Sequence, residues 1–273
     1  MRIIALLICF GFSQTSLCQK LPKNYGNIDT QLFLSQNSGN SLVVAFGGSE
    51  GGNSFASEKA KDVREDFLRR GFHFLAVGYF GAKGLPKSLD RISLSAINDT
   101  IQNMSKHLEI PQSNILLVGA SRGGELVLHL ASHFDFMGVI AIVPSNITIP
   151  NYSKKKATSS WTLNDIEVPY YQVDEALVKE EGWPEAVEQS LITLEQSNIG
   201  VIPIENIDGF VLLTSGKLDK LWPSYPMCEK MIDRLNMKNF KFPFAHIAFN
   251  EGHDASGHWP KIFTFLDQQL KDQ

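Results

Sequence analysis

The chain is poor in cysteine, and beyond its first twenty residues it has no long apolar run. Three of its 273 residues are cysteines, and two of them, Cys9 and Cys18, lie within the first eighteen positions. Without that segment only Cys228 would remain, so no intramolecular disulfide could form and the hydrophobic core would have to stabilise the fold alone. No later run is apolar and long enough to predict a transmembrane helix.

An excess of either charge is also absent. The 25 Lys and Arg residues against 29 Asp and Glu residues give a formal net charge of −4, and the pI is near 6.0. Proteins that bind nucleic acid carry a basic surface, so we expect no nucleic-acid partner. The basic run at 154–156 is short and fits a solvated loop, with contact to an anionic substrate as the alternative.

The first eighteen residues have the pattern of a secretory signal peptide. Arg2 precedes the apolar run 3–10, and Ser16 and Cys18 are small residues at the −3 and −1 positions of a cut before Gln19. The apolar run is too short for a stable membrane anchor. Cys18 also raises lipidation as a less favoured alternative. We therefore expect a mature chain, residues 19–273, that is exported to the periplasm or secreted.

Apolar runs alternate with stretches of helical period along the mature chain, without an internal repeat or a low-complexity linker. The spacing predicts strands at 42–46, 72–77, 114–118, 139–143, 210–214 and 244–249, and helices at 56–71, 94–108, 124–131 and from 260 onward. This alternation is typical of a single α/β domain whose mostly parallel sheet is covered by helices on both faces.

The alternation stops between about 146 and 207. This stretch contains Trp161, Tyr170, Tyr171, Trp183 and a helical segment at 184–196, and it is too rich in apolar residues for a disordered loop. It follows a strand at the end of the sheet where ligands bind in α/β folds. We interpret it as a cap in which Trp161 and Trp183 contact the substrate, with a packing layer remote from the site as the alternative.

A G-x-S-x-G pentapeptide spans residues 119–123. It stands between a predicted strand and a predicted helix, which is the context in which this pattern forms a nucleophile elbow. Ser121 would then lie at the helix N-terminus, where free backbone N–H groups favour a developing negative charge. We predict that Ser121 is a nucleophile, against the alternative of an ordinary serine in a glycine-rich turn.

A serine nucleophile needs a base to take its proton and a carboxylate to orient that base. In α/β-hydrolases these residues follow in the order Ser, Asp or Glu, His. Asp219 comes directly after the predicted strand 210–214, in a glycine-containing loop, and is the predicted acid. Glu205 and Asp208 precede that strand and are weaker candidates.

His253 follows the last predicted strand directly and is the predicted base. His258 is its rival, but it leads into the final helix, and His246 lies within a strand. A metal site that combines Glu251, His253, Asp254 and His258 is the remaining alternative. The glycines between these residues suit a loop better than a rigid set of ligands, so we expect no metal.

The oxyanion of an acyl-transfer intermediate needs backbone N–H donors. One donor comes from Arg122, the residue after the nucleophile, and a second from the loop after an earlier strand. The glycine-rich loop 47–52 has that position, and we expect Gly48 or Ser49 to supply the donor. The loop lacks the lysine and the spacing of a phosphate-binding loop, so we expect no nucleotide cofactor.

Five segments carry a resemblance to a known family: residues 84–89, 119–126, 202–205, 219–222 and 252–253. Together they resemble the C-terminal catalytic α/β-hydrolase domain of the acyl-CoA thioesterase and bile acid-CoA:amino acid N-acyltransferase family. The resemblance implies the same nucleophile, acid and base: Ser121, Asp219 and His253. In this family the thioesterases carry serine at the nucleophile position, whereas the amino-acid transferases carry cysteine.

We therefore expect an α/β-hydrolase that cleaves a small-molecule acyl thioester or ester through an acyl-Ser121 intermediate, without a cofactor. Two alternatives stay open. One is an acyltransferase that passes the acyl group to an amine, and the other is an exported binding protein of the same fold without turnover. An exported chain would be separated from cytosolic acyl-CoA, so the leaving group stays open too.

Overall fold

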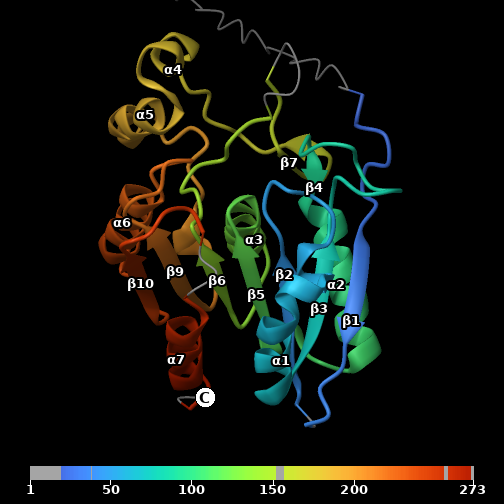
Figure 1. The fold of residues 1–273 in the computed structure, drawn as a ribbon. Helices are drawn as coiled ribbons and strands as arrows, with labels where there is room; N and C mark the ends of the chain where they lie inside the picture. Colours follow the sequence, from blue (N-terminus) through green and yellow to red (C-terminus); the bar gives the residue numbers. More distant parts are fainter. Residues whose placement is uncertain (1–19, 38, 152–156, 255–257, 272–273) are drawn as a thin grey trace, which may run out of the picture.

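The computed structural model describes residues 20–37, 39–151, 157–254 and 258–271. The expected signal peptide and the basic run 154–156 lie outside these ranges. A seven-stranded sheet forms the centre of the molecule, in the order β1-β3-β2-β5-β6-β9-β10 (Figure 1). Its strands are β1 (Asp29–Phe33), β2 (Ser41–Phe46), β3 (Phe72–Gly78), β5 (Ile115–Ala120), β6 (Gly138–Ile142), β9 (Phe210–Gly216) and β10 (Phe244–Phe249). Neighbouring strands run parallel, except that β1 is antiparallel to β3.

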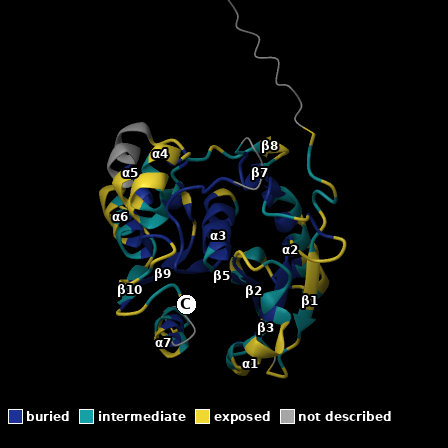
Figure 2. Cartoon of the chain, turned by 45° about the horizontal axis from the view of Figure 1, so that its top comes forward, coloured by how far each residue is buried: buried dark blue, intermediate teal, exposed yellow. Residues whose placement is uncertain are grey.

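Helices cover both faces of this sheet, as the alternation predicts. Alternate side chains of β2 show the two layers: Leu42, Val44 and Phe46 pack in one apolar cluster, and Val43 and Ala45 in the other. The first cluster includes residues of α2 (Leu94–Leu108), α3 (Arg122–His133) and α6 (Ser224–Met237), and the second includes residues of α1 (Lys61–Arg69) and α7 (Trp259–Gln269). Figure 2 shows the central strands and α3 in the buried colour.

Local chemistry sets where the helices begin and end. Ser93 caps α2 by accepting the Ala96 N–H, and the helix ends at Glu109 in the left-handed conformation, two residues before Pro111. The helix expected from residue 56 starts later. The 3₁₀ turns η1 (Ser54–Ala56) and η2 (Glu58–Ala60) replace its first part. The reason is Arg64, whose buried guanidinium donates to the carbonyl groups of Phe55 and Ser57 and holds them outside a regular helix.

The interruption at 146–207 contains α5 (Trp183–Ser197), which agrees with the helical segment expected at 184–196, and several short elements that periodicity alone does not reveal. The short elements are β7 (Trp161–Leu163), β8 (Ile166–Glu167), α4 (Glu175–Glu181) and η4 (Ile204–Asn206). The strand β7 pairs with the two-residue β4 (Ile92–Ser93), which precedes α2. Figure 1 shows β7, α4 and α5 beyond the carboxyl ends of the parallel strands. No helix in the described ranges combines the length and the apolar character needed to cross a bilayer.

Candidate active site

Ser121 occupies a sharp turn between β5 and α3. Its φ of 56° and ψ of −118° are a backbone conformation that residues other than glycine rarely adopt. The turn needs small neighbours. A Cβ on Gly119 would overlap the carbonyl group of Gly123, and a Cβ on Gly123 would overlap the carbonyl groups of Phe46 and Gly47 at the end of β2. The G-x-S-x-G spacing therefore also lets β2 and its loop approach the nucleophile position closely.

The structure brings Ser121, His253 and Asp219 together. The Ser121 hydroxyl donates to Nε2 of His253 over 2.8 Å, and Nδ1–H of His253 donates to Oδ2 of Asp219 over 2.7 Å. Asp219 follows β9 and His253 follows β10, so parallel strands deliver all three residues to one edge of the sheet. In this arrangement an imidazole can take the serine proton while a carboxylate holds its tautomer.

Asp219 has further partners that keep it ionised. Its Oδ2 also accepts the Ser224 hydroxyl at 2.7 Å, and its Oδ1 accepts the backbone N–H of Leu221 at 3.0 Å. Burial acts to raise the pKa of Asp219, but the hydrogen bonds from His253 and Ser224 outweigh it and leave the pKa below its ordinary value. Asp219 is therefore a carboxylate at neutral pH.

The rival residues make other contacts. Glu205 accepts two hydrogen bonds from Arg234, and Asp208 is exposed. His258 stacks on Phe249, and its Nε2 lies 3.0 Å from Oε2 of Glu251. In the described part of the chain, no three or more His, Cys, Asp or Glu side chains are grouped so that they could hold a metal ion.

A second Ser–His–Glu chain of hydrogen bonds lies away from Ser121. Ser215 Oγ and Nε2 of His246 are 2.7 Å apart, and Nδ1 of His246 lies 2.6 Å from Oε1 of Glu229. Ser215 is only 1% exposed, so a substrate carbonyl has no approach to its hydroxyl. This network therefore joins β9, β10 and α6 and serves the fold, consistent with a structural His246.

The glycine-rich loop after β2 lies against the nucleophile. Gly48 is buried, and a Cβ on it would stand 3.0 Å from Cβ of Ser121, whereas Ser49 is exposed. The Gly48 N–H donates to Oε1 of Glu50 at 3.0 Å, a contact that the sequence did not predict. Arg122 begins α3, so its N–H belongs to the first turn, which has no acceptor within the helix. Gly48 and Arg122 thus flank Ser121.

A cavity of about 330 Å³ opens at Ser121. Both Ser121 and His253 line it, and Glu50, Lys59 and Asp254 add charged groups. Its apolar lining comes from η1, η2, α1, the end of β6 and the start of α7: Phe55, Ala60, Val63, Ile142, Val143 and Trp259. No described residue of the stretch 146–207 is among its lining residues. The described part of the expected cap therefore does not line this cavity.

Trp161 and Trp183 do not take the position expected of them. Trp161 is fully buried, packs beside Tyr79 and His129, and donates its indole N–H to the Glu125 carboxylate. It is part of the main core because β7 pairs with β4, so the expectation that Trp161 contacts the substrate is corrected. Trp183 is partly buried and packs against an apolar cluster that includes Ile147, Val187 of α5 and Trp222. It too lies outside the described lining of the Ser121 cavity.

The stretch 146–207 is instead anchored to the nucleophile helix by a buried ion pair. The guanidinium of Arg122 lies 2.6 Å from Oε2 of Glu125, one turn along α3. Arg122 also donates to the carbonyl of Ile149 and to Ser160, and Glu125 accepts the Ile149 N–H. Burial outweighs the Arg122 guanidinium and raises the pKa of Glu125 to about 7. Both side chains are almost completely buried, so each depends on the other and on these hydrogen bonds for its polar partners.

Trp222 is the site residue whose role the sequence left open, although it belongs to the resembling segment 219–222. Its indole packs edge-to-face against the His253 ring, with centroids 5.1 Å apart. Its Nε1–H donates to the carbonyl of Val143 at 3.1 Å. Val143 lines the cavity with a φ of 43°, which is unusual for a β-branched residue, and Trp222 helps to hold it there.

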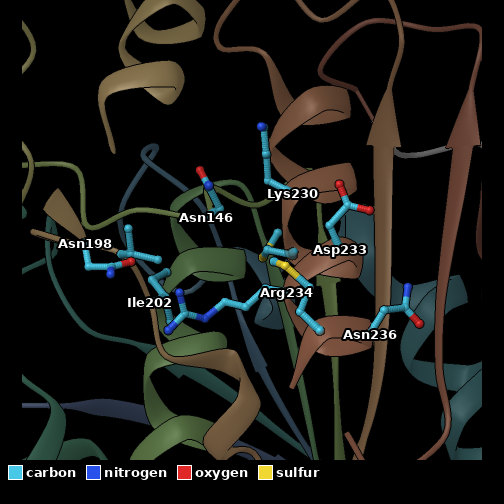
Figure 3. Close-up of a pocket in the computed structure, with 10 residues that line it drawn as sticks. Asn146, Asn198, Ile202, Lys230, Asp233, Arg234 and Asn236 are labelled. Atoms are coloured by element: carbon cyan, nitrogen blue, oxygen red, sulfur yellow. The ribbon is translucent and has the colours of Figure 1, made fainter. Parts of the chain in front are cut away.

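A second, larger cavity of about 620 Å³ lies between α6 and the segment around Ile202 (Figure 3). Its lining includes the amide side chains of Asn146, Asn198 and Asn236 and the charged side chains of Lys230, Asp233 and Arg234. None of the three residues Ser121, Asp219 and His253 is among its lining residues. The larger cavity is therefore separate from the serine site.

Solved structures share the fold at low sequence identity. Est1E from Butyrivibrio proteoclasticus, solved with ferulic acid, aligns with a TM-score of 0.55 at 15% identity, over 90% of this chain and 94% of that one. The carboxylesterase of Bacillus cereus gives a TM-score of 0.55 at 12% identity, over 89% of this chain and 94% of the other. These likenesses establish the α/β-hydrolase fold and nothing finer.

A family model identifies the family, and curated relatives agree with it. Human acyl-coenzyme A thioesterase 1 is 25% identical over 185 residues, which are 67% of this chain and 43% of that protein. Human acyl-coenzyme A thioesterase 6 is 26% identical over 238 residues, 85% of this chain and 53% of that protein. The chain thus spans about half the length of these relatives. The sequence model described as "BAAT / Acyl-CoA thioester hydrolase C terminal" matches residues 92–259. The chain belongs to this family.

Proposed function

We propose that this protein is a serine hydrolase that cleaves an acyl thioester or ester through an acyl-Ser121 intermediate. Ser121 Oγ attacks the acyl carbon while Nε2 of His253 takes its proton, and Asp219 stabilises the imidazolium that forms. The intermediate collapses when His253 returns that proton to the leaving sulfur or oxygen. Water, activated by His253 in the same way, then releases the acid and frees Ser121.

The observation that carries the proposal is the pair of hydrogen bonds that joins Ser121, His253 and Asp219 beside an apolar cavity. The strained Ser121 backbone supports it, because strain of this kind persists where a function requires it. The buried Ser215 network shows that a similar set of hydrogen bonds can also be structural. Access to a cavity is what separates the two serines.

A fluorophosphonate probe, which reacts covalently with activated serines, tests the proposal. The wild type and Ser215→Ala should be labelled, and Ser121→Ala should not. Loss of a triad member typically lowers kcat on the order of 10⁴- to 10⁶-fold, so ester hydrolysis should disappear with the labelling. Circular dichroism confirms that each variant is folded. Labelling of folded Ser121→Ala at wild-type level would exclude Ser121 as the nucleophile. A wild type that is neither labelled nor active would favour the alternative of a binding protein without turnover.

The acyl group and the leaving group are tested together. We propose that the apolar wall around Phe55 and Trp259 receives the acyl chain, because it lies directly at Ser121. The names of the relatives make acyl-coenzyme A thioesters the first substrates to assay. A panel of acyl-CoAs, acyl pantetheines and simple esters with matched acyl chains would rank the leaving groups. Equal rates across the panel would mean that the leaving group is not recognised.

We also propose that the chain is exported after cleavage before Gln19. The support is the sequence pattern of residues 1–18, which lie outside the described part of the structure. N-terminal sequencing of the protein from its native source tests this. A cytosolic protein with an intact N-terminus would contradict export and would make acyl-CoA the natural thioester to consider.

A further inference from the structure

We propose that Tyr79 is a positioning residue that orients the Gly47–Gly48 peptide, so that the Gly48 N–H acts as the second oxyanion donor. The inference rests on the proposed hydrolase function and adds to it a residue that the sequence did not single out. It concerns a hydroxyl group on the far side of the glycine-rich loop from the substrate.

The Tyr79 hydroxyl lies where it can fix that peptide. Tyr79 directly follows β3, is 1% exposed, and donates its O–H to the Gly47 carbonyl at 2.7 Å. Its ring packs against the rings of Phe46, Phe80 and Trp161, whose centroids lie 5.1–6.2 Å from its own. A ring held on several sides has little freedom, so the hydrogen bond is made from a fixed point in the core.

The geometry of the peptide unit links the position of the Gly47 carbonyl to the direction of the Gly48 N–H. The carbonyl of Gly47 and the N–H of Gly48 belong to one planar trans peptide and therefore point in opposite directions. Because Tyr79 draws the carbonyl into the core, the N–H must point outward, where Oε1 of Glu50 accepts it at 3.0 Å. Glu50 and Ser121 both line the cavity, so the N–H faces the space in which the reaction would occur.

Gly47 needs an external partner because glycine does not restrict its own backbone. A side chain at Gly47 cannot replace that partner, since its Cβ would collide with Ser54 and with the Glu50 carboxylate. Burial raises the pKa of Tyr79 far above its ordinary value, so the hydroxyl keeps its proton throughout any practical pH range. Tyr79 therefore donates under all assay conditions.

The chemistry then follows from the attack on the acyl carbon. As Ser121 Oγ forms its bond to this carbon, the proton passes to His253 and the carbonyl π pair moves onto the oxygen. That oxygen becomes an anion between the N–H groups of Arg122 and Gly48. The Glu50 carboxylate must leave Gly48 for this to happen, and as an exposed side chain it can turn into solvent. Tyr79 keeps the N–H in place during the exchange.

The test compares Tyr79→Phe with Tyr170→Phe. Both variants lose one hydroxyl that donates to a backbone carbonyl, but Tyr170 donates to Ala157 and is not among the described lining of the Ser121 cavity. Removing an oxyanion donor itself costs about 10²- to 10³-fold in kcat, so loss of its positioning should cost roughly 10-fold. We expect kcat to fall in Tyr79→Phe with KM nearly unchanged, and Tyr170→Phe to behave as the wild type.

A second readout isolates the oxyanion. The wild type and both variants are assayed on an ester and on its thionoester, whose C=S sulfur is a poor hydrogen-bond acceptor. The ratio of ester to thionoester kcat/KM should fall in Tyr79→Phe and stay constant in Tyr170→Phe. A general disturbance of the fold would slow both substrates equally and leave the ratio unchanged, which would overturn the proposal.

A crystal structure of the wild type with a boronate bound to Ser121 does not depend on whether the variant folds. A boronate oxygen should lie about 2.7–3.1 Å from the Gly48 nitrogen, with Tyr79 still on the Gly47 carbonyl. An oxygen bound by Ser49 instead would overturn the inference. Failure of the hydrolase proposal looks different, because the wild type would then neither turn over the ester nor bind the boronate covalently.

Discussion

One imidazole joins the nucleophile to the acid, so the protonation of His253 should control activity. An imidazolium cannot accept the Ser121 proton, and kcat/KM should therefore fall as the pH decreases. The pKa of Asp219 lies below its ordinary value, so this carboxylate stays ionised over the range in which a histidine gains its proton. We expect log kcat/KM on a neutral ester to fall with a limiting slope of about 1 on the acid side.

A pH–rate profile from pH 4 to 9 measures this slope. Two further variants test whether this slope comes from His253: His253→Ala should remove activity, and His258→Ala should keep the pH–rate profile of the wild type. A slope near 2, or an active His253→Ala, would mean that a different group or more than one group titrates.

Glu50 is the side chain whose substitution should increase the rate. Its carboxylate accepts the Gly48 N–H in the free protein and competes with the substrate oxygen for it. Hydrogen bonds to charged groups contribute about 1.5–3 kcal/mol when buried, and less at an exposed position such as this. We expect Glu50→Ala to accelerate fluorophosphonate labelling several-fold and Glu50→Gln to lie between it and the wild type. Slower labelling of both variants would show that Glu50 supports the loop rather than obstructs it.

At the residue scale, the predictable positions were those that a motif or a strand end marks. Ser121, Asp219 and His253 each follow a strong apolar strand, so their meeting at one sheet edge could be anticipated. Tyr79 and Glu50 could not, because their roles arise from contacts with backbone groups that leave no spacing in the sequence. The prediction for Trp161 was wrong because the sequence does not show whether a tryptophan side chain faces a ligand or the core.

Among the secondary elements, η2 and the start of α7 shape the cavity at Ser121. Ala60 of η2 is a small residue in its wall, so Ala60→Leu should shorten the acyl chain that fits. Each methylene that can no longer be buried costs about 0.8 kcal/mol, or about fourfold in kcat/KM. We expect the chain-length optimum to move to shorter acids, with acetyl esters unaffected. Ala82→Leu, on an exposed loop, is the matched control.

The measurement is a series of esters of increasing acyl length on the wild type and both variants. Trp183→Ala belongs in the same series, since its side chain packs with α4 and α5 instead of lining the cavity. If Trp183→Ala moves the optimum and Ala60→Leu does not, the acyl chain lies under the stretch 146–207 and not in this cavity.

Long elements with a regular period were predictable, and short ones were not. The strand at 244–249 and the helix at 94–108 agree with β10 and α2, because an apolar strand and an amphipathic helix each repeat one pattern over their length. In β4, β7 and β8 two or three residues pair, too few to show a period. The helix α6 was missed because prolines at 223 and 226 obscure its beginning.

At the scale of the whole molecule, a buried ion pair within α3 makes hydrogen bonds to a region distant in sequence. Arg122 and Glu125 tie α3 to Ile149 and Ser160, and both side chains are almost completely buried. Removing one partner of such a pair typically costs 3–5 kcal/mol, because the other charge remains buried. Arg122→Met should therefore lower the free energy of unfolding by up to that amount, as measured by urea denaturation, because Glu125, whose pKa burial raises to about 7, can take up a proton and lose its charge.

The control is Arg234→Met, which removes the more exposed ion pair with Glu205 and should cost about 1 kcal/mol or less. The double variant Arg122→Met with Glu125→Leu should recover much of the loss, since no uncompensated charge remains. Equal effects of Arg122→Met and Arg234→Met would mean that the buried pair is hydrated and that the stretch 146–207 is held mainly by its apolar contacts.

The scarcity of cysteine has an experimental consequence. Cys228 is buried on α6 beneath the sheet, and its sulfur faces the Thr214 carbonyl at 3.8 Å. Burial raises the pKa of this thiol well above its ordinary value, so the reactive thiolate is scarce while the fold is closed. If residues 1–18 are removed, Cys228 is the sole thiol of the chain. Its alkylation rate then becomes a built-in reporter of how often α6 lifts from the sheet, without any label added by design.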